Sequence, residues 1–310
     1  MRAAAIFGLG CSPKYLRPFQ SDQTIEWQIG LPSAPDQADI ILLFGGDGTI
    51  HRQLSQLVKL RLPVLIVPAG SGNDFARALG LGSVRESIEG WRRFCAGRDS
   101  VRAIDLGVIS PLSKNAGGAP PPHEPSRYFC SVAGVGLDAE VSRRANALPR
   151  WLRGHGGYAL TLAPTIFRFA PFGAKIMSAE TGIWTMRSDQ PILLAAFANT
   201  GIYGGGMKIA PHALMDDGQL DVCVVGGVGP FKLARMFPTV YFGRHLRIRE
   251  VDYFQAAHIR VETETPLDVY ADGEYVCQTP VEVTIEPAAF QVIVGAKSHR
   301  LDSPPHGFKL

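Results

Sequence analysis

Residues 40–49 read IILLFGGDGT, and this stretch decides the fold. The apolar, β-branched run Ile40–Phe44 is typical of a strand buried on both faces, as in a parallel sheet. The turn Gly45–Thr49 contains three glycines, which let the chain bend sharply and approach a ligand closely. A helix is predicted from Ile50, because apolar side chains recur there at i, i+4, i+7 and i+8. Strand, glycine turn and helix in this order predict a parallel α/β layer.

The same pattern occurs on both sides of this stretch. Ala3–Phe7 is a predicted buried strand before it, and Val64–Val67 is another after it. The second strand runs into the turn PAGSGND at residues 68–74, followed by a helix over Phe75–Leu79. Because neighbouring parallel strands end at the same edge of a sheet, both glycine turns are expected to face one crevice.

Both turns are candidates for binding phosphate, because backbone N–H groups and the positive end of a helix favour an anion. Asp47 inside the first turn indicates a bridging Mg²⁺, a catalytic base or a hydrogen bond to a ribose hydroxyl. In the second turn Asn73 and Asp74 stand at the start of a helix, and Arg77 lies one turn inside, within reach of a phosphate. The alternative is a pair of unrelated turns in which Asp47 and Thr49 merely cap helices.

Beyond Asp105 the sequence becomes rich in strands. Ser110–Ser126 is a Pro/Gly/Ser-rich loop by composition, and two helical insertions are predicted near Tyr158–Phe169 and Phe231–Phe242. Turn residues separate many of the strands, which is typical of an antiparallel sandwich. The predicted strands are Tyr128–Val132, Ile192–Ala198, Leu220–Val225, Ala257–Val261, Leu267–Ala271, Val281–Ile285 and Gln291–Val294.

These patterns predict an α/β protein of two domains. Residues 1–105 form the expected parallel α/β nucleotide-binding domain, and residues 106–297 form the expected antiparallel β-sandwich domain with lipid-side and catalytic residues. The polar tail 298–310 either packs back on the first domain or hangs free.

Composition narrows the function. With 46% apolar residues among 310, the chain can form packed cores and is not disordered. A formal net charge of +3 suits a protein that handles nucleotide phosphates or approaches an anionic membrane, but it is too small to indicate either. The five cysteines lie far apart with no CxxC pair, which argues against a zinc site or a disulfide framework and fits a reducing cytosol. No apolar run has membrane-spanning length, so a membrane would be met from its surface.

Two acidic motifs in the second half have two interpretations each. GGGMKIAP at residues 204–211 leads to Asp216-Asp217-Gly218, where one carboxylate and neighbouring carbonyls could bind a hard cation; the alternative is a turn before Leu220–Val225. Asp272-Gly273-Glu274 could supply a general base with a partner carboxylate, or it could be a hairpin turn alone.

Aromatic and basic side chains alternate in two segments, within residues 151–172 and within Phe231–Arg249. Such mixtures suit an anionic membrane surface. The alternative is an ordinary amphipathic helix with core aromatics and a solvated basic face. The side chains concerned are Trp151, Arg153, His155, Phe167, Arg168, Phe169 and Phe172 in the first segment, and Arg235, Arg244, Arg247 and Arg249 in the second.

Taken together, the motifs resemble the diacylglycerol kinase catalytic-domain family, in particular its soluble bacterial lipid kinases, with sphingosine and ceramide kinases as more distant relatives. The resemblance rests on GGDGT, PAGSGNDFAR, GVGLDAEV, YGGGMKIAPHALMDDGQLDV and YADGE, which span most of the chain. NAD kinases and phosphofructokinases share a turn like GGDGT, but the NDFAR and GGGMKIAP…DDG stretches are not part of the NAD-kinase pattern. The resemblance implies that ATP binds in a cleft between the nucleotide domain and the β-sandwich, where the active site would lie.

The resemblance also implies roles for individual residues. Asp272 matches the catalytic base and Glu274 its neighbour, while Asp47 and Asp105 match acids linked to the base through Mg²⁺ and water. Asp217, with the carbonyls of Leu214 and Gln219, matches a second, structural Mg²⁺ site. Asp138 falls where the sphingosine-kinase branch contacts its lipid head group. The implied ATP-binding residues are Gly45, Gly46, Asp47, Gly48, Thr49, Gly70, Ser71, Asn73, Asp74 and Arg77.

The chain departs from the family pattern near its first strand and after the first turn. Residues 7–14 read FGLGCSPK where the family has Asn-Pro followed by a small residue and glycine, and His51-Arg52 replace the usual Asn-Glu. The segment between the first strand and GGDGT is short, which predicts that a helix and a strand are trimmed.

The implied function is ATP- and Mg²⁺-dependent phosphorylation of a hydroxyl of diacylglycerol or a similar lipid. The expected protein is cytoplasmic and in peripheral contact with a membrane, its partners are the lipid but no nucleic acid, and a homodimer is left open. Two alternatives remain: an NAD kinase of the same superfamily, and a catalytically silent lipid-binding or regulatory protein.

Overall fold

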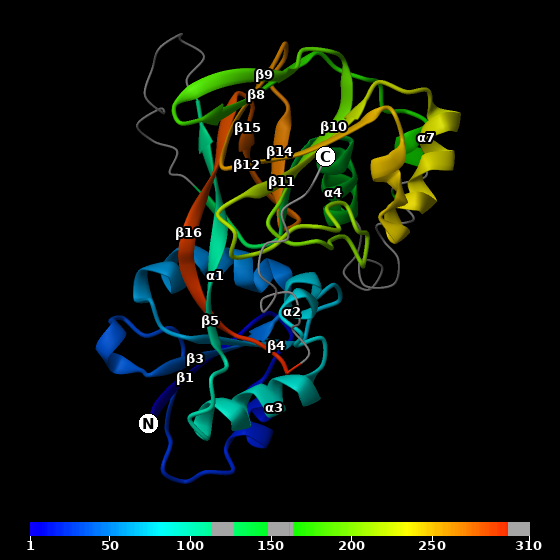
Figure 1. Cartoon of the computed structure of the whole chain (residues 1–310). Coiled ribbons are helices and arrows are strands. Elements are labelled where there is room, and N and C mark those ends of the chain that lie inside the picture. The colour runs from blue at the N-terminus through cyan, green and yellow to red at the C-terminus, as the bar shows by residue number, and fades with distance from the viewer. Residues whose placement is uncertain (113–126, 148–160, 162–163, 297–310) are drawn as a thin grey trace. The chain divides into compact units, whose positions relative to one another are not determined.

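The computed structural model describes residues 1–112, 127–147, 161 and 164–296 (Figure 1). The chain divides into two compact units. The first contains Met1–Asp105, Leu214–Asp217 and the described residues from Pro287 onward. The second contains Leu106–Ala213 and Gly218–Glu286.

The first unit is built on a parallel sheet in the order β2-β1-β3-β4. The last residues of β16 extend it, since Val292 lies opposite Val64 in parallel. Strands β3 and β4 are buried along their whole length, as expected for strands covered on both faces. The parallel α/β prediction for this part of the chain is therefore confirmed. The strands are β1 (Arg2–Phe7), β2 (Glu26–Ile29), β3 (Ile40–Gly45) and β4 (Val64–Pro68).

Three α-helices of this unit follow β3 and β4 in the chain. Helix α1 (Asp47–Leu60) buries the predicted stripe through Ile50 and Leu54, and α2 (Asp74–Ala78) follows the second glycine turn as expected. Helix α3 (Val84–Cys95) has no counterpart among the predicted helices. Its N-cap is Ser83, whose hydroxyl accepts the N–H of Glu86.

The short segment between β1 and β3 contains a strand, β2, but no α-helix. A 3-10 helix over Pro13–Phe19 stands where a longer helix would fit, and β2 follows it. Pro18 inside this turn removes an N–H donor and would break an α-helix, which is the physical reason for the replacement. The expected trimming is thus correct for the helix and wrong for the strand.

The second unit is an antiparallel sandwich, as predicted. One layer has the order β12-β11-β10-β7-β14-β15. The other contains β8, β9 and β13 with the second-unit parts of β5, β6 and β16. The bounds are β5 (Val101–Pro111), β6 (Arg127–Phe129), β7 (Val132–Gly136), β8 (Ala174–Glu180), β9 (Ile183–Ser188), β10 (Ile192–Ala198), β11 (Leu220–Gly226), β12 (Val251–Ala256), β13 (His258–Thr263), β14 (Asp268–Ala271), β15 (Glu274–Gln278) and β16 (Val281–Ile293).

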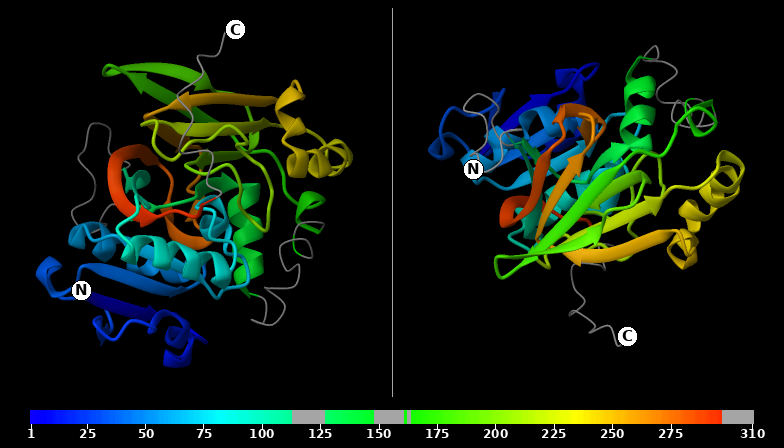
Figure 2. Two further views of the ribbon diagram at one scale, coloured as in Figure 1. Left: turned by 60° about the horizontal axis from the view of Figure 1, so that its bottom comes forward. Right: turned by 90° about the horizontal axis from the view of Figure 1, so that it is seen from above.

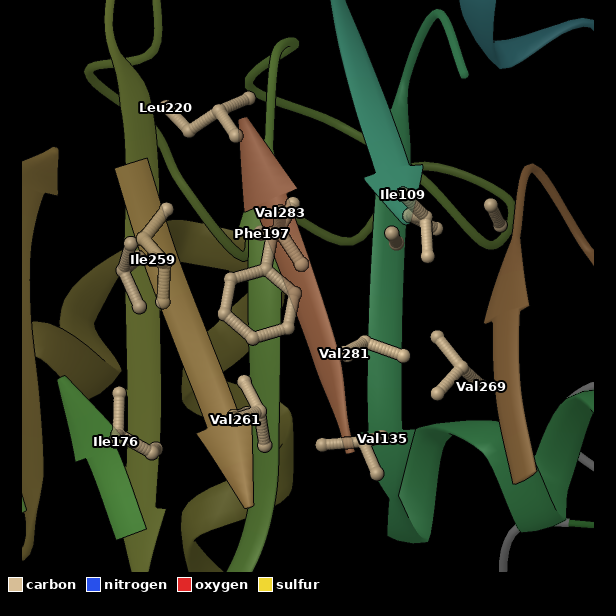
Figure 3. Close-up of a cluster of buried hydrophobic side chains, with 14 of the residues drawn as sticks. Ile109, Val135, Ile176, Phe197, Leu220, Ile259, Val261, Val269, Val281 and Val283 are labelled. Atoms are coloured by element: carbon tan, nitrogen blue, oxygen red, sulfur yellow. The ribbon is translucent and has the colours of Figure 1, made fainter. Parts of the chain in front are cut away.

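Side chains of the two layers meet in one core. In Figure 3 Phe197 of β10 lies among Val261 of β13, Val283 of β16 and Val135 of β7. The other face of β10 is covered as well, because Leu194 packs in a second cluster with Leu137 of α4 (Leu137–Ala147). Burial of both faces explains why β10 reads as a continuous apolar run.

Several boundaries differ from the sequence-based expectation. The predicted strand Tyr128–Val132 is interrupted at Cys130-Ser131, between β6 and β7, and the two last predicted strands form the single strand β16. The helical insertion Phe231–Phe242 is confirmed as α7 (Pro230–Met236) followed by a 3-10 helix over Phe237–Phe242. Strand β5 continues through Pro111, into the predicted loop.

Some predictions lie wholly or mainly outside the described residues. These are the rest of the loop up to Ser126, most of the insertion near Tyr158–Phe169, and the tail 298–310. Within the described part of the chain, no helix is long and apolar enough to cross a membrane. All five cysteines are free thiols.

Candidate active site

The two glycine turns of the first unit touch each other. A Cβ added to Gly70 would lie 2.5 Å from the Cα of Gly46, so neither position has room for a side chain. The N–H of Ala69 donates to the carbonyl of Gly45 at 3.0 Å. The structure therefore brings the turns after β3 and β4 together, as the sequence predicts for adjacent parallel strands.

Asp47 connects the first turn to the second helix. Its Oδ2 accepts the N–H of Asp74 at 3.1 Å, and its Oδ1 accepts the N–H of Phe75 at 3.2 Å. The carboxylate thus caps α2 rather than α1, whose N-cap is Gly46 and which has no side-chain cap. Asp47 therefore has a structural role, because its carboxylate joins the first turn to the helix that follows the second.

The second turn is held by its own side chains. Asn73 adopts φ 57° in the left-handed region, where its Oδ1 accepts the N–H of Gly70 at 2.9 Å and its Nδ2 donates to the Gly70 carbonyl at 2.7 Å. Asparagine tolerates this backbone conformation better than most residues. Arg77 pairs with Asp74 at 2.5 Å, so its guanidinium is already engaged by a carboxylate. Ser71 lies in the same turn, between Gly70 and Asn73.

Thr49 joins the divergent first-strand turn to this site. A Cβ on Gly8 would lie 2.4 Å from the Thr49 Oγ1, and one on Gly45 would lie 2.7 Å from the Thr49 Cβ. Gly8 also donates its N–H to the carbonyl of Phe44 at 2.7 Å. The FGLGCSPK segment therefore packs directly on the GGDGT turn, a contact that the motif alone did not predict.

Three carboxylates gather at the other candidate site of the first unit. Burial and the nearby charges of Asp105 and Asp217 raise the pKa of Asp216. Asp105 is buried, with its Oδ1 accepting the N–H of Ala288 at 2.8 Å. Leu214 and Gln219 lie in the same loop before β11, which turns at Gly218 with φ 72°. Among the described residues no group of three or more His, Cys, Asp or Glu side chains could hold a metal ion, so carbonyl ligands would be needed.

Asp272 is more than a turn residue. Asp272 and Gly273 both have positive φ, 50° and 81°, as a two-residue type I′ hairpin requires. The Asp272 carboxylate also accepts backbone N–H groups at the break between β6 and β7: Ser131 at 2.8 Å, Cys130 at 2.9 Å and Val132 at 3.3 Å. Glu274 opens β15, opposite Ala271. The carboxylate therefore ties the turn between β14 and β15 to the break between β6 and β7.

Asp138 lies in the wall of an apolar pocket of the second unit. Its carboxylate is buried at the start of α4, and the Tyr203 hydroxyl donates to its Oδ1 at 2.8 Å. Burial raises the pKa of Asp138 to about 6, against the lowering effect of the Tyr203 bond. The pocket has an empty volume of about 790 Å³, open solvent at its mouth included. Its lining is Leu137, Asp138, Val141, Ile166, Leu194, Tyr203, Met207, Ile209, Val225, Leu233, Met236, Phe237, Val240, Tyr241, His245 and Val251.

The three consecutive glycines explain how Tyr203 reaches this pocket. Gly204, Gly205 and Gly206 all have positive φ, so the unusual backbone that the sequence indicated is present. The loop closes on itself, because Tyr203 and Met207 exchange backbone hydrogen bonds at 2.9 and 3.0 Å. Both side chains then line the pocket.

The raised pKa of Asp138 predicts a pH-dependent stability. The folded-state pKa of about 6 exceeds the ordinary value of 3.8, so this group favours the folded state below pH 3.8, and that contribution is lost as the pH rises to about 6. The difference amounts to about 3 kcal/mol. Asp138→Asn should therefore melt at a temperature that depends less on pH between 4 and 6.5 than the wild type does. Tyr203→Phe removes the hydrogen bond that lowers the Asp138 pKa, so the pH midpoint of the loss of stability should move upward. If the melting temperatures of the wild type and of Asp138→Asn change with pH in parallel, Asp138 is not the titrating group.

The roles of Tyr203 and of the Cys130–Val132 amides were not predicted, whereas Asp216 was named with Asp217 in the possible cation site. Tyr203 opens the stretch YGGGMKIAP, but that stretch pointed to the glycines and gave the tyrosine hydroxyl no role. The amides at the strand break carry no sequence motif.

Comparison with known proteins identifies the family. Residues 27–109 match the diacylglycerol kinase catalytic domain, and residues 131–294 match the YegS C-terminal NAD kinase beta sandwich-like domain. A diacylglycerol kinase of Mycobacterium tuberculosis is 33% identical over 261 residues, covering 82% of this chain and 76% of the relative. A diacylglycerol kinase of Bacillus subtilis is 26% identical over 279 residues, with 85% and 80% covered.

Solved structures share the fold. A diacylglycerol kinase from Bacillus anthracis superposes with a TM-score of 0.64 at 19% identity, covering 95% of this chain and 97% of that one. An NAD kinase from Archaeoglobus fulgidus, solved in complex with ATP, gives a TM-score of 0.52 at 14% identity, with 97% and 96% covered. With a 33% identical relative aligned over most of both chains and family matches in both halves, the chain belongs to the diacylglycerol kinase family of lipid kinases.

Proposed function

We propose that the protein is an ATP- and Mg²⁺-dependent kinase that phosphorylates a hydroxyl of diacylglycerol or a similar lipid. The observation that carries the proposal is the pocket of the second unit, whose walls are mainly aliphatic and aromatic. Such a lining suits acyl chains, whereas the acceptor of an NAD kinase is a polar dinucleotide.

The few polar groups of the pocket could orient a lipid head group. Asp138 and Tyr203 form one pair, and His245 lies elsewhere in the wall. The His245 Nε2 lies 3.0 Å from the Ile209 carbonyl, while its buried Nδ1 has no hydrogen-bond partner among the described residues. Burial lowers the pKa of His245, which favours the neutral ring, and with Nε2 bonded to the Ile209 carbonyl the Nδ1 would act as an acceptor in this wall of the pocket.

In this proposal the first unit supplies the phosphate site. Gly46 and Gly70 keep the two turns free of side chains where they meet, and α1 begins without a side-chain cap. Backbone amides at such a position suit the phosphates of ATP. In this proposal Gly45–Thr49 and Gly70–Arg77 contact the nucleotide, and Asp272 accepts the proton of the lipid hydroxyl. The binding of ATP between the two domains stays a prediction.

The donor set around Asp217 fits a hard cation. Burial and then the nearby charges of Asp105 and Asp217 raise the pKa of Asp216, with Arg102 acting in the opposite direction, so an added cation would relieve the remaining repulsion. Asp217 with the carbonyls of Leu214 and Gln219 would hold the proposed structural Mg²⁺. A Mg²⁺ ion at the phosphates would neutralise charge during phosphoryl transfer.

Magnesium should therefore stabilise the protein through Asp217. We expect Mg²⁺ to raise the melting temperature of the wild type, and Asp217→Ala to lose most of that rise. Asp36→Ala removes one exposed carboxylate of the same unit and should respond to Mg²⁺ like the wild type. Equal Mg²⁺ shifts in wild type and Asp217→Ala would refute the structural site.

One assay tests the whole proposal. The purified protein is incubated with radiolabelled ATP, Mg²⁺ and a total lipid extract in mixed micelles, and in parallel with NAD. We expect a labelled lipid that can be identified by mass spectrometry, and no NADP. NADP without labelled lipid would make the protein an NAD kinase. If neither product forms, a silent lipid-binding protein is favoured.

In this proposal the protein acts in the cytoplasm, in peripheral contact with the membrane that holds its substrate. The free thiols are compatible with a reducing compartment.

A further inference from the structure

The segment between β11 and β12 forms a helical insert, residues 230–249, made of α7 and two 3-10 helices, Phe237–Phe242 and Arg244–Arg247. In Figure 1 and in both views of Figure 2, these yellow helices project from one edge of the second unit. The inner side of the insert supplies walls of the apolar pocket, including Leu233, Met236 and Val240. A single element thus borders the pocket and faces outward.

The outer side of the insert exposes large aromatic rings. Phe231 is 81% exposed and Phe242 is 71% exposed. Phe167, 55% exposed, extends the patch, since its ring centroid lies 5.8 Å from that of Phe231. Tyr241 is 39% exposed and also lines the pocket, so the patch and the pocket wall are continuous. Grouped exposed aromatics on one element mark a surface that binds something apolar.

The same surface is basic. Residues 227–249 contain no Asp or Glu but contain Lys232 and four arginines. Lys232 is neutralised by Glu250 at 2.6 Å. Arg235, Arg244 and Arg247 are exposed, and none of them forms an ion pair with another residue of the described chain. The Arg244 guanidinium lies 6.0 Å from the centre of the Phe242 ring, which leaves its charge available.

We propose that the helical insert is a docking surface for an anionic phospholipid bilayer. Phe231 and Phe242 would enter the interfacial layer, where aromatic rings are favoured, and the arginines would lie against lipid phosphates. Charge complementarity selects this occupant, because a second copy of the chain would bring the same unpaired arginines together. The inference rests in part on the proposed function, because an enzyme whose substrate is a lipid must bring its pocket to a bilayer.

Vesicle binding tests the surface without catalysis. The full chain is mixed, in the absence of nucleotide, with vesicles of phosphatidylcholine alone or of phosphatidylcholine with phosphatidylglycerol, and sedimented. We expect binding to the anionic vesicles only, weakened by salt. The double variants Phe231→Ala/Phe242→Ala and Arg244→Gln/Arg247→Gln should each bind the anionic vesicles at least about tenfold more weakly than the wild type.

Matched variants control for size and charge. Arg85→Gln/Arg92→Gln removes two exposed charges from α3, and Ile183→Ala removes a side chain of β9 that is 70% exposed. Both should bind the anionic vesicles like the wild type. Equal losses in the Arg85→Gln/Arg92→Gln variant would overturn the proposal, because net charge alone would then explain binding. Equal binding of the wild type to neutral vesicles would also overturn it.

An activity assay separates this inference from the proposed function. On a short-chain lipid that is monomeric in water, the insert variants should keep the wild-type kcat, and they should lose activity only on vesicles. If these variants lose vesicle binding and the wild type phosphorylates no lipid, the docking surface is supported and the proposed kinase activity is refuted. Unchanged vesicle binding with normal phosphorylation would refute the surface alone. Self-association of the wild type that Phe231→Ala/Phe242→Ala abolishes, without vesicle binding, would identify a second copy as the occupant instead.

Discussion

Asp272→Asn should lower kcat by about 10²- to 10⁴-fold, because an amide cannot accept the proton of the lipid hydroxyl. Asparagine tolerates the left-handed backbone of a type I′ turn, so the hairpin itself should form. Stability should nevertheless fall. The carboxylate uses both oxygens on the amides of Cys130, Ser131 and Val132, whereas an asparagine presents one oxygen and one NH₂ group. The rate must therefore be measured well below the melting temperature of the variant, together with ATP binding.

Asn146→Ala provides the matched control for this experiment. The Asn146 Nδ2 donates to the carbonyl of Gly273 at 2.6 Å, so its loss loosens the same turn without touching the carboxylate. We expect a lower melting temperature and a kcat within a few-fold of the wild type. If folded Asp272→Asn also keeps a kcat within a few-fold of the wild type, Asp272 is not the base, and Glu274 and Asp105 become the next candidates.

Asp47→Ala should abolish measurable phosphoryl transfer while costing only a helix cap in stability. The proposed role of Asp47 in metal bridging or base activation predicts the loss of activity. Its two hydrogen bonds to α2 predict a free energy of unfolding lower by about 1 kcal/mol. The measurements are labelled product formation in mixed micelles and a denaturant or thermal melt.

Ser83→Ala separates the two effects. It removes the cap of α3 in the same unit, through the hydroxyl that accepts the N–H of Glu86. Its stability should fall by a similar amount and its activity should stay near that of the wild type. Near-normal turnover in Asp47→Ala would remove Asp47 from the mechanism and leave it a cap.

The alternation of elements followed from local patterns in the sequence. Strands β3 and β4 and helix α1 were predictable because burial on both faces leaves a continuous apolar run and burial on one face leaves a helical stripe. The juxtaposition of the two glycine turns followed as well, because parallel topology leaves little choice. Strands β2, β5, β8, β9, β12 and β15 had no predicted counterpart. Strand β9 is largely exposed, and β12 mixes buried and exposed side chains, so neither carries a clear apolar pattern.

The sequence by itself determined the family, the parallel and antiparallel halves, and which carboxylates deserve testing, because those features depend on residues close together in the chain. Only the tertiary structure decided what these carboxylates touch. Asp272 and Cys130 are 142 residues apart, and Asp138 and Tyr203 are 65 apart, yet each pair forms a hydrogen bond. Such contacts, like the pocket behind the helical insert, depend on how strands and helices pack, and no local pattern of residues encodes that packing directly.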